Sequence, residues 1–144
     1  MILVVVTGSR GWTDRKVIEG RLEAIEATGE LACVIEGGAQ GADRIAGQWA
    51  ARARKRGIGW VRFPAEWRRN GVYNPHAGKG RNTEMARWAL KAQERCGWEV
   101  QVLAFMLTGP GASVSRGTQH MISTCKDLGL HGCVVRSGPR NPGG

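Results

Sequence analysis

The stretch that decides the fold is Ile2-Leu3-Val4-Val5-Val6-Thr7-Gly8-Ser9-Arg10-Gly11, an apolar run that ends in a glycine turn. Five consecutive apolar residues indicate a strand, and the run is too short, and lacks the basic flank, for a signal peptide. A second run, Leu31-Ala32-Cys33-Val34-Ile35, leads into Glu36-Gly37-Gly38-Ala39-Gln40-Gly41 in the same way. The chain therefore repeats one unit, a strand followed by a glycine-rich turn.

Outward from these two units, short β-rich runs alternate with longer segments of helical period. The predicted strands are residues 2–6, 31–35, 58–63, 100–105 and 133–135. The predicted helices are residues 14–28, with Asp14 or Thr13 as the cap, 42–56, 82–96 and 117–128. Residues 65–80 have no strong period and are predicted to form a long loop. This alternation predicts an α/β fold with a mostly parallel sheet.

Length and composition fit one globular domain, because the chain has 144 residues of which 42% are hydrophobic and 23% charged. We expect residues 1–136 to form this domain and residues 137–144 to form a flexible Gly/Pro-rich tail. No stretch approaches the roughly 18 apolar residues that span a bilayer. The expected protein is soluble and cytoplasmic, with no membrane partner.

The four cysteines, at positions 33, 96, 125 and 133, are scattered and form no C-x-x-C pair. Because zinc sites need cysteine or histidine ligands at characteristic spacings, we predict reduced packing residues and no metal site. No cofactor is expected to be required.

The charge is strongly basic, with 21 Lys and Arg against 12 Asp and Glu, a formal net charge of +9. Such a charge favours a polyanionic or phosphate-bearing partner. Part of it, at Arg52, Arg54, Lys55 and Arg56, falls on the solvent face of a predicted helix. A basic helix face either binds nucleic acid or is simply solvated, and the sequence leaves both interpretations open.

Glycine is the other unusual feature, with 22 residues in 144. Its clusters follow predicted strands, and the carboxyl ends of parallel strands meet at one edge of a sheet, where ligands bind. Glycine there lets backbone N–H groups approach phosphate oxygens, and helix N-termini add partial positive charge. The clusters predict either a composite anion site or only tight turns. Neither a Walker A loop nor G-x-G-x-x-G is present, which disfavours a kinase, an ATPase or an NAD dehydrogenase.

Five motifs in this order resemble one family. They are Val6-Thr7-Gly8-Ser9-Arg10-Gly11-Trp12, Glu36-Gly37-Gly38-Ala39-Gln40-Gly41-Ala42-Asp43, Phe63-Pro64-Ala65-Glu66-Trp67, Arg81-Asn82-x-x-Met85 and the loop closed by Gly117-Thr118. Together they resemble the YspA-type, cpYpsA-related branch of the SLOG superfamily. That superfamily includes the LOG phosphoribohydrolases, which cleave the N-glycosidic bond of nucleoside monophosphates, the DNA-processing protein DprA, and sensor domains for NAD-derived signals. The resemblance implies a Rossmann-like three-layer fold, a nucleotide or ADP-ribose/NAD-like ligand, and a homo-oligomer.

The resemblance implies two walls of ligand-binding residues: Thr7, Gly8, Ser9 and Arg10 in the first wall, and Gly37, Gly38, Gly41 and Asp43 in the second. The last loop is longer than in LOG enzymes. Its hydroxyls and its backbone donors at the helix start predict a third, phosphate-binding wall of Ser113, Ser115, Arg116, Gly117 and Thr118. Arg10 is either a bidentate phosphate clamp or a solvated turn residue. Asp43 either binds ribose or caps the following helix.

Two residues are the candidates for catalysis. Arg81 resembles the arginine that LOG enzymes place beside the scissile bond, and at a helix start a cation has little structural reason. His120 stands where the P-G-G-x-G-T-x-E motif of LOG enzymes has its glutamate, and an imidazole stabilises an oxocarbenium-like centre poorly. We predict His120 as a general acid, a phosphate ligand or a helix histidine with a structural hydrogen bond. Whether the protein is an enzyme stays open.

The tryptophans have either a packing or a ligand-binding role, and the positive charge leaves two functions open. Trp49 and Trp88 fall on apolar helix stripes and are predicted core residues, whereas Trp12 and Trp67 either stack on a purine or pack. Two functions follow: a site for a nucleotide-derived ligand, with or without N-glycosidic cleavage, or DprA-like binding of single-stranded nucleic acid. The second depends on the +9 charge and on the basic residues at 52, 54, 55, 56, 68 and 69.

Overall fold

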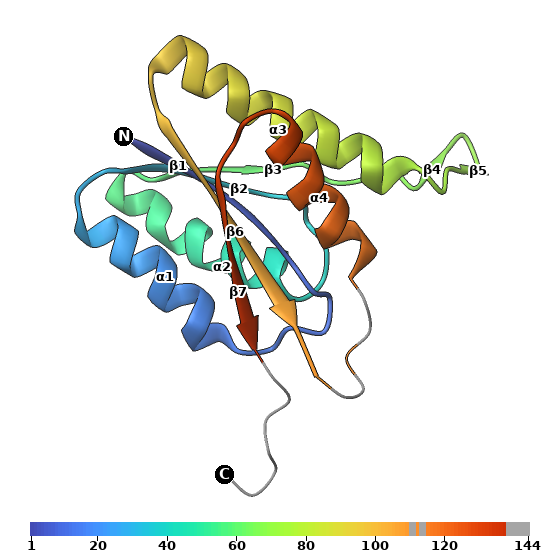
Figure 1. Cartoon of the computed structure of the whole chain (residues 1–144), viewed down its shortest axis with the longest axis horizontal. Helices are drawn as coiled ribbons and strands as arrows, with labels where there is room; N and C mark the ends of the chain where they lie inside the picture. The colour runs from blue at the N-terminus through green and yellow to red at the C-terminus, as the bar shows by residue number, and fades with distance from the viewer. Residues whose placement is uncertain (110–111, 113–114, 138–144) are drawn as a thin grey trace, which may run out of the picture.

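The computed structural model, which describes residues 1–109, 112 and 115–137, is an α/β fold around a parallel sheet (Figure 1). Its five strands lie in the order β3 (Gly59–Arg62), β2 (Leu31–Glu36), β1 (Ile2–Gly8), β6 (Glu99–Leu107) and β7 (Gly132–Ser137). Each neighbouring pair is parallel. The predicted α/β class, Rossmann-like with three layers and a mostly parallel sheet, is confirmed.

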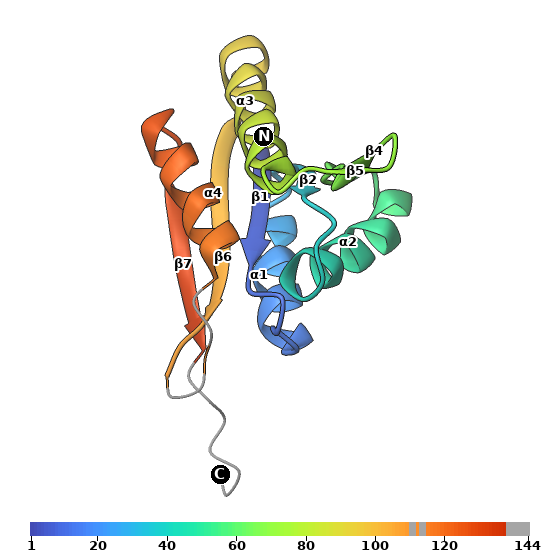
Figure 2. The same cartoon turned by 90° about the vertical axis from the view of Figure 1, so that its right-hand side faces the viewer.

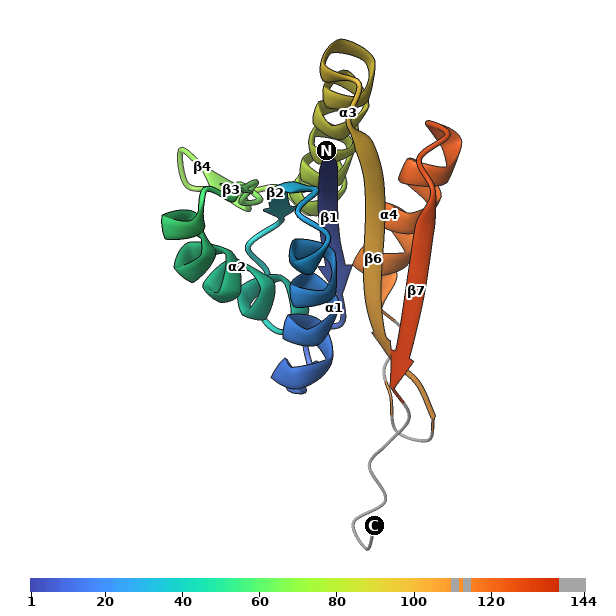
Figure 3. The same ribbon diagram turned by 90° about the vertical axis from the view of Figure 1, so that its left-hand side faces the viewer.

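Helices cover both faces of this sheet (Figures 2 and 3). Ile2, Val4 and Val6 of β1 face one core, which α1 (Arg15–Ala27) and α2 (Ala42–Ala53) cover. Leu3 and Val5 face the other core, beneath α3 (Ala77–Cys96) and α4 (Arg116–Asp127). Successive side chains of a strand point to opposite faces, so an uninterrupted apolar run is what a central strand between two helix layers requires.

The helix boundaries near the amino-terminal half follow local signals. Asp14 caps α1, its carboxylate accepting a hydrogen bond from the Val17 N–H at 3.4 Å. The helix ends before Gly29, which has a φ of 76°. The predicted helix 42–56 is α-helical only to Ala53, and a 3-10 turn, η1 (Arg54–Arg56), completes it. Ser137, predicted to begin the flexible tail, is the last residue of β7, and 138–144 lie outside the described residues.

The predicted long loop at 65–80 is only partly correct, because its middle forms a hairpin and its last residues belong to α3. A short hairpin of β4 (Arg68–Arg69) and β5 (Val72–Tyr73) turns at Asn70 and Gly71, whose φ angles are 52° and 77°. Positive φ at both central residues is what a two-residue hairpin turn prefers. α3 then begins at Ala77, earlier than the predicted 82. Figure 1 shows the hairpin beyond the start of α3.

The order of the strands creates a crevice. From β1 the chain builds outward to β2 and β3, and then returns through α3 to place β6 on the other side of β1. The connections leave the carboxyl ends of β1 and β6 toward opposite faces of the sheet, and open α/β folds bind ligands at such a switch point.

The cysteines only partly match the prediction. Cys33 and Cys125 are buried, but Cys96 and Cys133 are exposed because they end α3 and lie on the edge strand β7. Within the described residues, no group of three His, Cys, Asp or Glu side chains is arranged to hold a metal ion. No helix in that part of the chain is long and apolar enough to cross a membrane.

Candidate functional site

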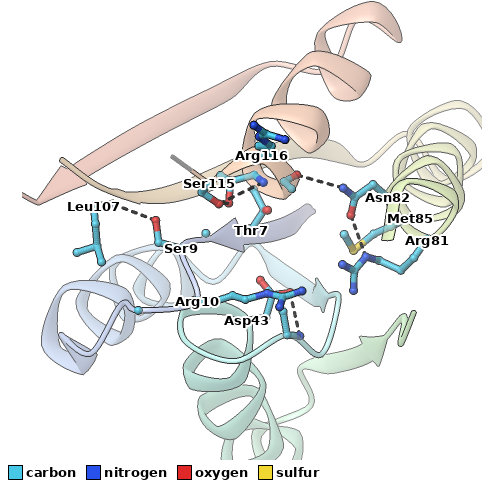
Figure 4. A pocket seen from close by; sticks show the side chains of 15 residues that line it. Thr7, Ser9, Arg10, Asp43, Arg81, Asn82, Met85, Leu107, Ser115 and Arg116 are labelled. Atoms are coloured by element: carbon cyan, nitrogen blue, oxygen red, sulfur yellow. Dashed lines mark hydrogen bonds between the residues drawn. The ribbon is translucent and has the colours of Figure 1, made fainter. Parts of the chain in front are cut away.

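A cavity of about 340 Å³ lies at the carboxyl edge of the sheet, between the ends of β1 and β6 (Figure 4). Its volume falls in the range of small-molecule sites, roughly 300 to 1,000 Å³. Most of the predicted site residues line it. The lining residues are Thr7, Gly8, Ser9, Arg10, Gly11, Ala39, Asp43, Arg81, Asn82, Met85, Leu107, Ser115, Arg116, Gly117 and Thr118.

The first wall is the turn after β1, which β6 holds in place. The Ser9 N–H donates to the Phe105 carbonyl at 2.8 Å, and the Ser9 hydroxyl accepts from the Leu107 N–H at 3.1 Å. A Cβ at Gly8 would lie 2.5 Å from Ala42 Cβ and 2.6 Å from the Phe105 carbonyl oxygen. Gly8 is therefore required for close packing of the strand, and the turn is held before any ligand binds.

The second wall is ordered by Asp43, whose carboxylate does not cap its own helix. Gly41 is the N-cap of α2, and Asp43 Oδ2 instead accepts from the N–H groups of Gly37 at 3.1 Å and Ala39 at 3.3 Å. The predicted helix cap is thus wrong, because the carboxylate reaches back to the loop after β2. Burial, and then the nearby Glu36 carboxylate, raise the pKa of Asp43 to about 7.

The three predicted glycines of this wall separate into two roles, and none of them lines the large cavity. Gly37 and Gly38 line a smaller cavity of about 190 Å³ beside it. Gly41 has a φ of 81°, and a Cβ there would collide with the carbonyl oxygens of Ser9 and Arg10. Gly41 therefore joins the first and second walls by close backbone packing.

Arg81 lies in the second turn of α3 and not at the helix start, because α3 begins earlier than predicted. Its Nη1 donates to the carbonyls of Gly37 and, at 3.4 Å, Phe63, and its Nε donates to Asn82 Oδ1 at 2.8 Å. Burial lowers the pKa of this guanidinium, Asp43 opposes that effect, and Arg10 adds to it. An arginine stays protonated under these conditions, so the structure holds a fixed, half-buried cation at the cavity.

Three arginines are among the residues that line this cavity: Arg10 from the β1 turn, Arg81 from α3 and Arg116 from α4. In Figure 4 the side chain of Arg116 lies at the α4 side, apart from those of Arg10 and Arg81. Arg10 and Arg116 are exposed. Among the described residues, none of the three forms an ion pair with a carboxylate. Unpaired guanidinium groups around one cavity favour an anionic ligand.

The third wall is the start of α4. Ser115 is the N-cap: its hydroxyl accepts from the Thr118 N–H at 3.4 Å, and its O–H donates to the Thr118 hydroxyl at 2.5 Å. The first backbone N–H groups of a helix have no intrahelical partner, and together with the helix dipole they attract negative charge. Ser113, also predicted for this wall, lies outside the described residues.

Asn82 is a polar site residue that the sequence did not predict. Its Nδ2 donates to the Gly117 carbonyl at 3.2 Å and lies 3.2 Å from His120 Nδ1, while its Oδ1 accepts from Arg81. It therefore connects α3 to the start of α4. A signal was available, because Asn82 shares the buried stripe of α3 with Met85, and a polar residue on an apolar stripe needs partners.

His120 does not line the cavity. Its ring lies between α3 and α4, and burial, followed by the Lys79 charge, lowers its pKa. A neutral imidazole can accept the Asn82 amide hydrogen at Nδ1, which leaves the proton on Nε2. This geometry matches the structural alternative for His120, and a catalytic role for it stays a prediction.

The tryptophans also separate. Trp12 is buried, meets Phe105 edge-on with ring centroids 5.5 Å apart, and donates its indole N–H to the Asp14 carbonyl at 2.8 Å. Trp12 is therefore a packing residue, and neither face of its indole is accessible to a ligand in the large cavity. Trp49 and Trp88 join the two cores as predicted. Trp67 lines the smaller cavity.

Glu66 and Glu84, the carboxylates of the segment after β3 and of α3 nearest in sequence to these residues, line neither cavity. The buried carboxylate beside the site is Glu36. It accepts from the Gly38 N–H at 2.5 Å and pairs with Arg62 at 2.9 Å. Glu36 therefore holds the loop after β2, and its charge acts on Asp43.

Comparison with known proteins agrees with this architecture. A family model described as the YspA, cpYpsA-related SLOG family matches residues 2–70, which contain the β1 turn and the loop after β2. The gene 61 protein of Mycobacterium phage D29 is 35% identical over 130 residues, covering 88% of this chain and 90% of that protein. The chain belongs to the YspA, cpYpsA-related SLOG family.

Proposed function

We propose that the protein binds a nucleotide or a nucleotide-derived ligand, such as an ADP-ribose or NAD-like molecule, with its phosphoryl group in the cavity between β1 and β6. The observation that carries this proposal is that Arg10, Arg81 and Arg116 line one cavity, and that none of them forms an ion pair with a carboxylate among the described residues. Family membership supports a nucleotide-related ligand.

The electrostatics of the cavity support an anion. The first turn of α4 offers N–H donors beside Arg116, and Arg81 is held by two carbonyls and Asn82. A guanidinium that is already held in place loses less conformational freedom when it binds a phosphate. Asp43 opposes an anion only when it is ionised, and its pKa of about 7 leaves a large neutral fraction at neutral pH.

The lining is not purely polar, which supports a ligand larger than inorganic phosphate. Met85 and Leu107 contribute apolar surface to the same cavity. Ligand sites commonly combine an apolar wall with a few placed polar groups. A phosphorylated sugar offers both kinds of surface.

Cleavage of an N-glycosidic bond at this site would need a carboxyl group beside the bond. An oxocarbenium-like centre needs a carboxylate close by. Within the described residues, Asp43 is the carboxyl group among those that line the cavity, and His120 does not line it. We therefore propose binding as the function and assign any hydrolysis of a nucleoside monophosphate to Arg81 together with Asp43.

The nucleic-acid alternative loses part of its basis. Arg52 and Arg56 pair with Glu19 and Glu26 of α1, each at 2.7 Å. Paired side chains contribute less to the field that attracts a polyanion. A salt-dependent shift with a single-stranded oligonucleotide would be the signature of that alternative.

Calorimetric titration with AMP, ADP-ribose, NAD and ribose 5-phosphate tests the proposal. We expect at least one of these compounds to bind, and Arg81→Gln to weaken it by about tenfold or more, since hydrogen bonds to charged groups are worth ~1.5 to 3 kcal/mol. Arg87→Gln is the matched control, an exposed arginine on the same helix. Binding of none of the four, or equal weakening by both substitutions, would contradict the proposal. Native mass spectrometry of the same sample tests the homo-oligomer and reveals a co-purified ligand.

A further inference from the structure

The smaller cavity beside the arginines has its own character. It shares Arg10, Ala39 and Arg81 with the large cavity, so the two are adjoining lobes of one site. Its remaining lining residues are Gly37, Gly38, Pro64, Ala65 and Trp67. None of these carries a charge, and Trp67 is the aromatic residue among those that line either lobe. The second lobe therefore offers a flat apolar surface next to a cationic one.

Trp67 is held in place by the hairpin that follows it. The Trp67 carbonyl accepts from the Asn74 N–H at 2.7 Å, which closes the base of the hairpin. The Tyr73 ring stacks on the indole at 6.3 Å between centroids and 17° between planes, and the Arg68 guanidinium lies 5.8 Å from the Tyr73 centroid. The orientation of the indole is thus set before a ligand arrives.

The start of α3 is shaped to this indole. A Cβ at Gly78 would lie 3.0 Å from Trp67 Cη2 and 3.4 Å from Cζ2. Glycine is a poor helix former, so its presence in the first turn of α3 costs helix stability. The position fits a helix that must approach the indole closely.

Core packing does not explain this arrangement. Trp67 belongs to neither hydrophobic core, and its stacking partner Tyr73 is 56% exposed, next to Val72 at 69%. Trp67 itself is partly buried, and the ring stacked on it is exposed and lies outside both cores. A partly accessible indole supported by a second aromatic ring is what a stacking platform for a planar ring needs.

We propose that the second lobe receives the nucleobase of the ligand and that Trp67 is its stacking platform. This proposal rests on the proposed function, in which the phosphoryl group occupies the large lobe. Arg10 and Arg81 line both lobes, so the sugar that links base to phosphate lies beside them. Stacking selects an aromatic base over no base, and a purine offers the larger surface.

A comparison of two ligands tests the base subsite. AMP and ribose 5-phosphate share the phosphorylated sugar and differ in the base, so we titrate both into the wild type, Trp67→Ala, Trp67→Phe and Trp98→Phe. Trp98 is the matched control, because this half-buried indole precedes the amino end of β6 and lines neither lobe. We expect the wild type to prefer AMP, Trp67→Ala to weaken AMP by about tenfold with ribose 5-phosphate unchanged, and the two Phe variants to stay within about threefold.

The outcomes separate the two proposals. If neither compound binds the wild type, the base subsite is overturned, and the proposed function fails as well only if ADP-ribose and NAD do not bind either. If both bind but Trp67→Ala changes them equally or not at all, the base subsite alone is overturned. Should Trp67→Ala not fold, tryptophan fluorescence decides. AMP but not ribose 5-phosphate should quench the wild-type emission, and Trp67→Phe should remove most of that quenching. Quenching that persists in Trp67→Phe overturns the subsite.

Discussion

Two groups of arginines in this molecule have opposite surroundings. On the α1–α2 surface, Arg52 and Arg56 reach Glu19 and Glu26 at 2.7 Å. The second group, Arg10, Arg81 and Arg116, lies at the carboxyl edge of the sheet. These arginines line a cavity and form no ion pair among the described residues. The same side chain therefore serves one region as a surface cross-link and the other as a candidate ligand contact.

The difference shows that net charge does not locate a binding site. The +9 charge of the chain is a sum over both regions. The carboxylates decide which cations remain available, and α1 supplies Glu19 and Glu26 to the arginines of α2 and η1. Exposed ion pairs contribute little to stability, about 0 to 1 kcal/mol each, whereas a buried charge has large effects on its neighbours.

The largest effect is expected for Asp43, on the pH dependence of the free energy of unfolding. Its native pKa of about 7 lies above the ordinary 3.8, so the folded state binds this proton more tightly. The resulting stabilisation is complete below about pH 4 and is lost as pH rises to about 7. Asp43→Asn should therefore become more stable relative to the wild type across this window, by up to roughly 4 kcal/mol.

Chemical denaturation at several pH values measures this difference. The exposed carboxyl of Glu84 on α3 provides the control, and Glu84→Gln should follow the wild-type curve. Parallel curves for Asp43→Asn and the wild type would mean that Asp43 is not desolvated as the structure has it.

A smaller contrast is expected between two glycines with positive φ. Gly41, at the cavity, has a φ of 81° and lies against carbonyl oxygens, whereas Gly57, at the far end of the α2–η1 segment, has a φ of 89° and open space around its Cβ position. Gly57→Ala should cost roughly 1 kcal/mol from backbone strain alone, and Gly41→Ala roughly 3 kcal/mol because a clash is added. Urea denaturation gives both values, and equal losses would refute close packing between the first two walls.

The smallest effect is expected on the α1–α2 surface. Arg52→Gln removes the pair with Glu19, and the free energy of unfolding should change by no more than about 0.5 kcal/mol. Affinity for the ligand identified by calorimetry should not change, in contrast to Arg81→Gln. A loss of affinity in Arg52→Gln would erase the distinction between the two groups of arginines.

The fold could be predicted where the signals are local. The apolar runs gave the strands of the central sheet, and Asp14 marked the start of α1, because a cap acts on residues within one turn. The start of α3 could not be predicted, since Gly78 and Gly80 weaken the helical pattern. The contact of Gly78 with Trp67 arises only in the folded chain.

Most residues predicted for the candidate site line the large cavity, but the predicted glycines Gly37, Gly38 and Gly41 do not. Thr7, Arg10, Arg81 and Thr118 line the cavity as expected. Asn82 was missed, since an asparagine in a helix has many explanations until its partners are known.

By itself, the sequence determined the alternation of strands and helices, and with it the edge of the sheet where the glycine turns gather. It also carried the motifs of the family. Only the tertiary structure decided which arginines form no ion pair among the described residues, where the Asp43 carboxylate points, and that Trp67 lines the smaller cavity. The physical reason is that these properties depend on neighbours through space: Arg81 donates to a carbonyl 44 residues away in the chain.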